Sequence, residues 1–197
     1  MLEIILASAS PRRSKLLTQI GVTHKVHVSN VEENYTEGID PKVWVKDIAL
    51  LKALEVAKFY KKGIVIGADT IVVKDGFILG KPEDERMAMK MLEFLSGDTH
   101  EVMTGIALVN AKDPNQSYTH VETTKVLFRK LNSLEISNYV NTKEPMDKAG
   151  SYAIQGVGTL FVEGIEGCYN NVVGLPLNRL AQMLKRFNVE VLNVHNN

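Results

Sequence analysis

The stretch Ile64-Val65-Ile66-Gly67-Ala68-Asp69-Thr70-Ile71-Val72-Val73 is an apolar run that a single polar pair interrupts. Short continuous apolar runs are typical of strands buried in a parallel sheet. The stretch therefore predicts a buried strand over 64–68, which ends at Asp69 and Thr70 and continues over 71–73. Ligands of α/β proteins bind at strand ends, and a buried carboxylate is costly unless it is paired, metal-bound or catalytic. Asp69 is thus either a catalytic candidate or a structural acid bonded to backbone amides.

The residues before this strand predict a strand, a tight turn and a helix. A short apolar run over 2–7 precedes Ser8-Ala9-Ser10-Pro11-Arg12-Arg13, in which Ser10 suits the N-cap and Pro11 the first helical position. Further helices are expected over 41–62, 83–96, 133–141 and 175–187, and further strands over 22–28, 77–79, 100–111, 117–131, 159–162 and 189–194. Strands that alternate with helices and are followed by hairpins predict an α/β fold, with a mixed twisted sheet and flanking helices, in a single domain over residues 1–197.

The composition is that of an ordinary globular protein, because 45% of the 197 residues are hydrophobic and 23% are charged. Lys+Arg and Asp+Glu both number 23, so the net charge is zero, which argues against nucleic acid or an anionic membrane as a partner. The single cysteine, Cys168, excludes an internal disulfide framework. The first apolar run is too short for a signal peptide, and no run is long enough to span a membrane, so we expect a cytoplasmic location. A homodimer is expected only because it is the commonest oligomer.

The turn over residues 8–13 has the features of an anion site. Backbone N–H groups at a helix N-terminus are unpaired and lie at the positive end of the helix dipole. Here the hydroxyls of Ser8 and Ser10 and the guanidiniums of Arg12 and Arg13 add further donors. The simpler alternative is a capped helix with two solvated arginines.

Three further charged positions fit a polyphosphate site. Glu33, with Glu32 beside it, lies in an acidic loop and is the type of ligand that Mg²⁺ prefers, although a solvated acidic loop is the simpler interpretation. Lys52 lies on an otherwise apolar helical face, and Lys81 directly follows a predicted strand. Each lysine is either an exposed side chain or a point charge that neutralises phosphate groups.

Several segments, in order along nearly the whole chain, carry a resemblance to one family. They are Ser8-Ala9-Ser10-Pro11-Arg12-Arg13, Val31-Glu32-Glu33, Lys52-Ala53, Gly67-Ala68-Asp69-Thr70, Gly80-Lys81-Pro82, Thr104-Gly105, Lys143-Glu144-Pro145-Met146-Asp147-Lys148-Ala149-Gly150-Ser151-Tyr152-Ala153-Ile154-Gln155-Gly156 and Asn171-Val172-Val173-Gly174-Leu175-Pro176. Each segment alone is weak, but the ordered set is specific. The chain resembles the Maf family of nucleoside triphosphate pyrophosphatases, also called septum formation inhibitors.

The resemblance implies a metal-dependent enzyme, with Mg²⁺ or Mn²⁺ as cofactor, that cleaves a nucleoside triphosphate to the monophosphate and pyrophosphate. It also implies two lobes around a deep cleft, as in the inosine triphosphate pyrophosphatases. Matched by motif, Asp69 is the base that activates water, and Glu33, or Glu32 beside it, is a metal position. Glu33 and Asp69 together could hold the metal, and whether Asp69 acts mainly as base or as metal ligand stays open. The predicted substrate-binding positions are Ser8, Ser10, Arg12, Arg13, Lys52, Thr70, Lys81 and Gln155. Of these, Arg12, Thr70 and Gln155 mark the branch of the family that acts on dTTP and UTP, and modified pyrimidine triphosphates are possible further substrates.

Two other functions stay open at this point. A non-catalytic regulator of cell division would bind nucleotide in the same site without releasing pyrophosphate, and another branch of the family acts on 7-methyl-GTP. The acidic loop and Asp69 favour the enzyme, since a protein that only binds polyphosphate has little use for carboxylates unless a metal is bound.

Overall fold

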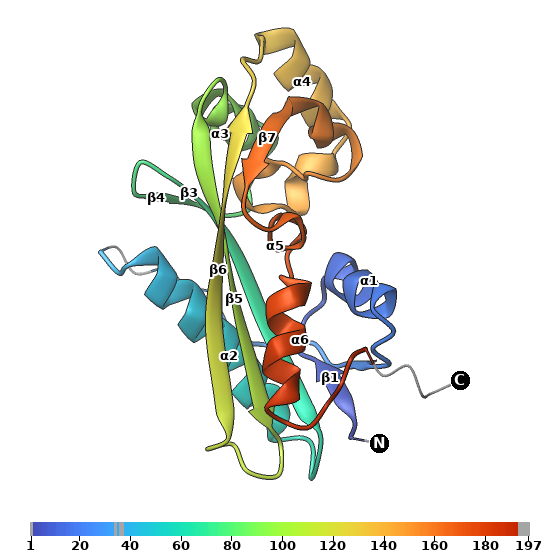
Figure 1. The fold of residues 1–197 in the computed structure, drawn as a ribbon. Helices are drawn as coiled ribbons and strands as arrows, with labels where there is room; N and C mark the ends of the chain where they lie inside the picture. The colour runs from blue at the N-terminus through green and yellow to red at the C-terminus, as the bar shows by residue number, and fades with distance from the viewer. Residues whose placement is uncertain (1, 34, 36–37, 193–197) are drawn as a thin grey trace. The chain divides into compact units, whose positions relative to one another are not determined.

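A computed structural model describes residues 2–33, 35 and 38–192 of the chain. Within them, seven strands form one sheet in the order β2-β1-β3-β5-β6-β7, with β4 paired to β3 (Figure 1). The strands are β1 (Ile4–Leu6), β2 (Lys25–Val26), β3 (Ile64–Lys74), β4 (Phe77–Leu79), β5 (Thr99–Asn110), β6 (Ser117–Phe128) and β7 (Val162–Glu166). Strand β1 is parallel to β2 and β3, whereas β3 and β4, and β6 and β7, are antiparallel. The predicted α/β fold with a mixed sheet is therefore confirmed.

The helices lie close to their predicted positions. They are α1 (Pro11–Gln19), α2 (Pro41–Ala57), α3 (Glu85–Leu95), α4 (Ser133–Asn141), α5 (Tyr169–Val173) and α6 (Leu177–Lys185), with short 3-10 helices η1 (Glu144–Asp147), η2 (Ala149–Ser151) and η3 (Gly156–Phe161). Helix α4 spans the predicted residues 133–141, and its N-cap is Asn132, which forms a reciprocal capping box with Glu135. No helix in the described part of the chain is both long and apolar enough to cross a membrane.

The chain divides into two compact units, in agreement with the two lobes that the resemblance implies. The first unit comprises Met1–Asp69, Thr104–Glu122 and Gly174–Asn197, and the second comprises Thr70–Met103 and Thr123–Val173. Strands β3, β5 and β6 contribute residues to both units. The deep cleft and the single domain over residues 1–197 stay predictions.

In the first unit, helix α2 packs against the sheet at two glycines. A Cβ atom on Gly67 of β3 would lie 2.1 Å from the carbonyl oxygen of Ala49, and one on Gly105 of β5 would lie 2.2 Å from that of Val45. The core beside this contact consists of small and branched residues, namely Ile5, Ala7, Ala49, Ala53, Val56, Ala57, Val65, Ala107 and Val109. The close approach brings the buried face of α2, which includes Lys52, onto β3.

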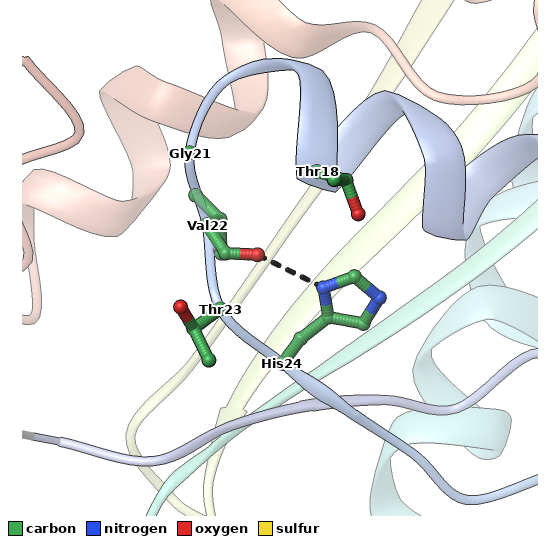
Figure 2. Close-up of a pocket in the computed structure, with 5 residues that line it drawn as sticks. All are labelled: Thr18, Gly21, Val22, Thr23 and His24. Carbon is green, nitrogen blue, oxygen red and sulfur yellow. Dashed lines mark hydrogen bonds between the residues drawn. The ribbon is translucent and has the colours of Figure 1, made fainter.

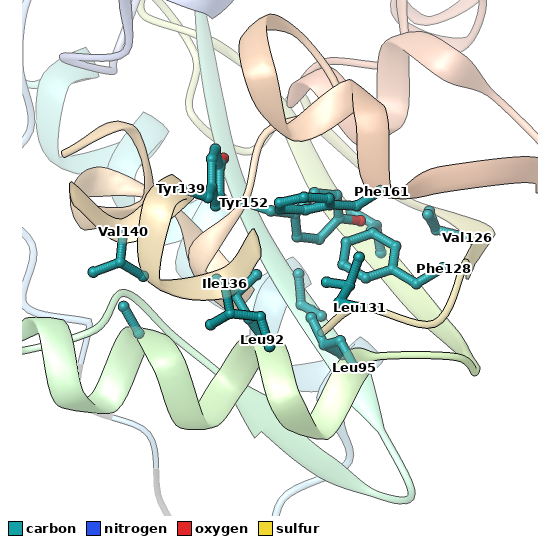
Figure 3. Packing of buried hydrophobic residues seen from close by; sticks show 13 residues of the cluster. Leu92, Leu95, Val126, Phe128, Leu131, Ile136, Tyr139, Val140, Tyr152 and Phe161 are labelled. Carbon is teal, nitrogen blue, oxygen red and sulfur yellow. The ribbon is translucent and has the colours of Figure 1, made fainter. Parts of the chain in front are cut away.

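The second unit has a core that is rich in aromatic rings (Figure 3). The ring centroids of Phe128 and Tyr152 are 4.7 Å apart, and those of Tyr139 and Phe161 are 4.8 Å apart. The remaining buried members are Val72, Ala88, Leu92, Leu95, Val102, Val126, Leu131, Ile136 and Val140. This cluster ties α3 and α4 to the segments that follow α4 in the chain.

Three strand predictions differ from the structure. Strand β3 runs without a break from Ile64 to Lys74, so Asp69 lies inside a strand and not at its end. The strand expected over 159–162 is wrong, because this segment is mostly 3-10 helix η3 and β7 begins at Val162. Of the strand expected over 189–194, residues 189–192 form none, and residues 193–194 lie outside the described residues.

Candidate active site

Lys52 is a buried lysine that lies between two carboxylates. Its Nζ donates hydrogen bonds to Oε1 of Glu33 at 2.6 Å and to Oδ1 of Asp69 at 2.7 Å. The side chains of Lys52 and Asp69 are each 8% exposed, whereas that of Glu33 is 42% exposed. A buried charge is tolerated when it is paired, and Lys52 is paired twice. The first unit thus brings together three predicted site residues that are far apart in the sequence.

Arg13 connects the start of α1 to the same part of the first unit. Its Nη1 donates to Oγ of Ser8 and to the carbonyl oxygen of Ala68, each at 2.9 Å. Its Nε donates to the carbonyl oxygen of Gly174 at 2.8 Å. Burial lowers the pKa of Arg13, and the negative charges of Asp69 and Glu33 oppose this effect. Since Ala68 precedes Asp69 in β3, Arg13 holds the backbone directly beside the buried acid.

The electrostatics of Asp69 suit a proton acceptor. Burial raises the pKa of Asp69, the positive charges of Lys52 and Arg13 lower it, and the Glu33 carboxylate raises it again. The net direction is upward, so this carboxylate binds a proton more readily than an exposed aspartate does. A general base works best when its pKa lies near the operating pH, and a raised carboxyl pKa moves in that direction.

The N-terminus of α1 supplies further polar groups. Ser8 is buried, and its Oγ accepts a hydrogen bond from the backbone N–H of Ser10 at 3.2 Å as well as from Arg13. Ser10 occupies the N-cap position with Pro11 after it, as predicted, but the Ser10 side chain makes no capping hydrogen bond within the described residues. The half-buried Arg12 lies at the same helix start, and its charge contributes to the lowered pKa of Arg13.

The two carboxylates fit a hard divalent cation. Oxygen atoms of Glu33 and Asp69 both lie within hydrogen-bond distance of Nζ of Lys52, so the two carboxylates lie close together and a cation would bind beside the ammonium group, not in its place. Mg²⁺ in enzymes that act on phosphates is commonly held by one or two carboxylates, together with water and substrate phosphates. Among the residues that the structure describes, no group of three or more His, Cys, Asp or Glu side chains could hold a metal ion alone. Glu33 and Asp69 therefore fit a metal that the substrate helps to bind.

The sequence matches known proteins over nearly its full length. Residues 3–187 match the family described as Maf-like protein. The chain belongs to the Maf family. Its curated relatives include a dTTP/UTP pyrophosphatase of Acetivibrio thermocellus, 51% identical over 98% of this chain and 98% of the relative, and one of Pelotomaculum thermopropionicum, 48% identical over 98% and 100%. A solved structure named nucleoside-triphosphatase / dITP/XTP pyrophosphatase, from Mycobacterium abscessus, is 14% identical over 98% of this chain and 100% of its own, with a TM-score of 0.44.

Three predicted site residues of this Maf chain belong to the second unit. Thr70 follows Asp69 in β3 and is half-buried, and Lys81 and Gln155 are exposed. Gly80, which precedes Lys81, accepts a hydrogen bond at its carbonyl oxygen from the N–H of Gly150 at 3.0 Å. This hydrogen bond connects the turn of Lys81 to the segment that precedes Gln155. The roles of Thr70, Lys81 and Gln155 stay predictions.

Sequence reasoning missed the groups that hold Arg13 in place. Two of them are backbone carbonyl oxygens, of Ala68 and Gly174, which are 55 and 161 residues away along the chain. A backbone oxygen is present in every residue, so composition and spacing give no signal for it. The family resemblance includes the segments that contain both residues, and it was the signal from which their importance could have been inferred.

A hollow elsewhere in the first unit does not contain the predicted site residues. It has a volume of about 330 Å³ and is lined by Thr18, Gly21, Val22, Thr23 and His24 (Figure 2). The His24 ring nitrogens are both engaged locally, Nδ1 with the Val22 carbonyl oxygen and Nε2 with Oγ of Ser14, each at 2.9 Å. The candidate active site of this Maf protein is therefore the charged cluster around Lys52.

Proposed function

We propose that the protein hydrolyses nucleoside triphosphates, preferentially dTTP and UTP and also modified pyrimidine triphosphates, to the nucleoside monophosphate and pyrophosphate. The observation that carries the proposal is the buried Lys52 between Glu33 and Asp69, with Arg13 nearby. Cleavage of a triphosphate needs a base for water, a site for a metal and positive charge for the leaving group, and this cluster has candidates for all three. The names of the curated relatives agree with this activity.

In the proposed reaction, Asp69 accepts a proton from a water molecule that attacks the α-phosphorus. A bond forms between the water oxygen and the α-phosphorus, and the bond from the α-phosphorus to the bridging oxygen of the pyrophosphate breaks. The raised pKa of Asp69 favours the proton transfer. Lys52, which contacts both acids, fixes the orientation of the Asp69 carboxylate before the substrate arrives.

The departing pyrophosphate gains negative charge, which cationic groups stabilise. We propose that Lys52, Arg12 and the donors at the start of α1, including Ser8 and Ser10, provide this stabilisation. Arg13 uses Nε and Nη1 to hold backbone and Ser8, so its main contribution is a fixed positive charge. When bound by Glu33 and Asp69, Mg²⁺ or Mn²⁺ supplies additional positive charge at the phosphate oxygens.

The proposal assigns substrate contacts to three residues of the second unit. Lys81 is exposed and provides a point charge for a phosphate group. Gln155 is exposed, and its amide provides one acceptor and a donor group, which complement the N3–H and carbonyl groups of uracil or thymine. For Thr70, the proposed substrate contact rests only on the match of its segment to the family. We place the activity in the cytoplasm, where nucleoside triphosphates are made and used.

A screen of ordinary and modified nucleoside triphosphates tests the proposal. Pyrophosphate and orthophosphate release are measured with Mg²⁺, with Mn²⁺ and after treatment with EDTA. We expect pyrophosphate with UTP and dTTP, less with GTP and ATP, and none after EDTA until metal is restored. Release of orthophosphate would show that a different bond is cleaved. Binding without any release would support the regulator, and faster cleavage of 7-methyl-GTP would identify the other branch.

A further inference from the structure

The backbone on both sides of Gln155 is hydrogen-bonded to one pair of side chains, Tyr139 and Glu144. Before Gln155 in the chain, the N–H of Ala153 donates to the Tyr139 hydroxyl at 3.3 Å. After Gln155, the N–H of Val157 donates to Oε2 of Glu144, and that of Gly158 donates to Oε1, each at 3.1 Å. The Tyr139 hydroxyl itself donates to Oε1 of Glu144 at 2.9 Å, so both sides share one hydrogen-bonded unit.

Two glycines make this arrangement possible. Gly156 has a φ of +78°, a conformation that residues with a Cβ rarely adopt, and a Cβ there would lie 2.7 Å from Oε2 of Glu144. A Cβ on Gly158 would lie 2.5 Å from the Ala153 carbonyl oxygen and 2.7 Å from the Tyr139 hydroxyl. The backbone around Gln155 therefore lies directly against the Tyr139–Glu144 pair.

The pair is itself anchored. Tyr139 is 2% exposed and packs edge-on against Phe161, within the aromatic cluster of the second unit (Figure 3). Burial and the adjacent Glu144 carboxylate raise the pKa of Tyr139, so its hydroxyl stays protonated and keeps donating. Glu144 begins η1, and its carbonyl oxygen accepts a hydrogen bond from Nζ of Lys148 at 2.6 Å.

We propose that Tyr139 and Glu144 are positioning residues for base selection: they fix the backbone on both sides of Gln155 and thereby set where its amide meets the base. The inference rests on the proposed function, in which Gln155 contacts the base. The Gln155 side chain is exposed, and an exposed glutamine has many rotamers, so its placement depends on a fixed backbone. Displacement of a recognition group by about 1 Å is enough to change rates strongly.

The test uses Tyr139→Phe, which removes one hydroxyl and leaves the ring in the core. Tyr152→Phe is the matched control, because it removes a buried hydroxyl from the same cluster, one that contacts Nε2 of His100 at 2.7 Å. For each variant, kcat and KM are measured with UTP and with GTP, and the thermal unfolding midpoint is recorded. We expect Tyr139→Phe to lower the ratio of kcat/KM for UTP over GTP by about 10-fold, mainly through KM for UTP. The control is expected to leave the ratio unchanged, even where its unfolding midpoint falls as far.

Glu144→Gln tests the other member of the pair, because its amide NH₂ group replaces an oxygen that accepts a hydrogen bond from the turn. It should lower the UTP-to-GTP ratio in the same direction. The decisive comparison adds Gln155→Ala to each variant. If the pair acts through Gln155, the double variants have the same ratio as Gln155→Ala alone.

The outcomes separate this inference from the proposed function. If Gln155→Ala leaves the UTP-to-GTP ratio unchanged, Gln155 does not contact the base, and both ideas fail at that point. If Gln155→Ala lowers the ratio but Tyr139→Phe and Glu144→Gln do not, the proposed base contact stands and the positioning role is overturned. Independent, additive losses in the double variants overturn it as well.

Discussion

Among the described residues, two buried lysines, Lys52 and Lys74, pair with aspartates, and the pairs differ in the surroundings of the carboxylate. In the first unit, Lys52 donates to Asp69 at 2.7 Å, and both side chains are 8% exposed. In the second unit, Lys74 lies 3.0 Å from Asp98, and the side chains are 7% and 59% exposed. Lys74 also donates to the carbonyl oxygen of Phe94 at 2.5 Å and lies over its ring.

The different burial of the two acids shifts their pKa values in opposite directions. The hydrogen bond from Lys74 and that from the Thr99 N–H lower the pKa of Asp98. Burial raises the pKa of Asp69, although Lys52 and Arg13 oppose it. The exposed Asp98 beside the buried Lys74 therefore stays ionised, and its charged form stabilises the fold. A buried acid beside a buried lysine binds a proton more readily, which suits catalysis.

The largest expected effect is that of replacing Asp69 by asparagine, and the same replacement of Asp98 serves as its control. Asp69→Asn removes the proposed base and should lower kcat/KM for UTP by about 10³-fold. The variant also leaves the buried Lys52 ammonium with one carboxylate partner fewer, so it should lower the free energy of unfolding at neutral pH as well. Pyrophosphate release and urea unfolding measure the two quantities.

Asp98→Asn is the control for this substitution. Since the pKa of Asp98 is lowered, its charged form stabilises the folded state, and the variant should be less stable at neutral pH while keeping its activity. Near-normal turnover by Asp69→Asn would exclude Asp69 as the base. Equal loss of activity in both variants would show that the two pairs do not differ in function.

A second prediction concerns His100, which is buried in the second unit. Burial, with a further contribution from the charge of Lys74, lowers the pKa of His100 from 6.5 to about 4. The unfolded chain therefore binds a proton at a higher pH than the folded chain does. Stability from this residue is complete above the unfolded pKa and declines as pH falls from about 6.5 to about 4, by about 3 kcal/mol in total.

The measurement is the free energy of unfolding across this pH range for the natural chain and for His100→Gln. Carboxyl groups also titrate there, so the difference between the two chains is the relevant quantity. It should shrink as the pH is lowered, because the variant has no imidazole to protonate in the unfolded state. A difference that is constant with pH would contradict the neutral, buried His100.

The sequence predicted most of the elements but few of the contacts that define the site. Helix α4 was predicted over the residues that it occupies, since helical periodicity is a local property. Asp69 was expected at a strand end because a polar pair in an apolar run suggests a break. The break is absent because Lys52, 17 residues earlier in the chain, pairs with Asp69 inside the strand. Such a contact depends on how α2 packs on β3, and only the family resemblance joined these residues in advance.

Gly67 holds α2 close to β3, and its substitution is expected to have the smallest of the three effects. A Cβ in Gly67→Ala would lie 2.1 Å from the Ala49 carbonyl oxygen and 2.9 Å from the Ala53 nitrogen, so α2 must move. Overpacking of this kind costs about 2 kcal/mol in the free energy of unfolding. Because Lys52 lies between Ala49 and Ala53 on α2, the shift should also separate Lys52 from Asp69 and lower pyrophosphate release.

Gly164→Ala in β7 is the matched control for the Gly67 substitution. A Cβ on Gly164 meets no atom within 4 Å, so stability should change by less than about 0.5 kcal/mol and activity should not change. Chemical denaturation and the UTP assay are applied to both variants. If Gly67→Ala loses stability but keeps full activity, the contact of α2 with β3 supports the fold without setting the distance from Lys52 to Asp69. If it loses both stability and activity, the close contact of α2 with β3 sets the distance from Lys52 to Asp69. The two lysine–aspartate pairs would then differ in the packing that holds them as well as in the pKa of the aspartate.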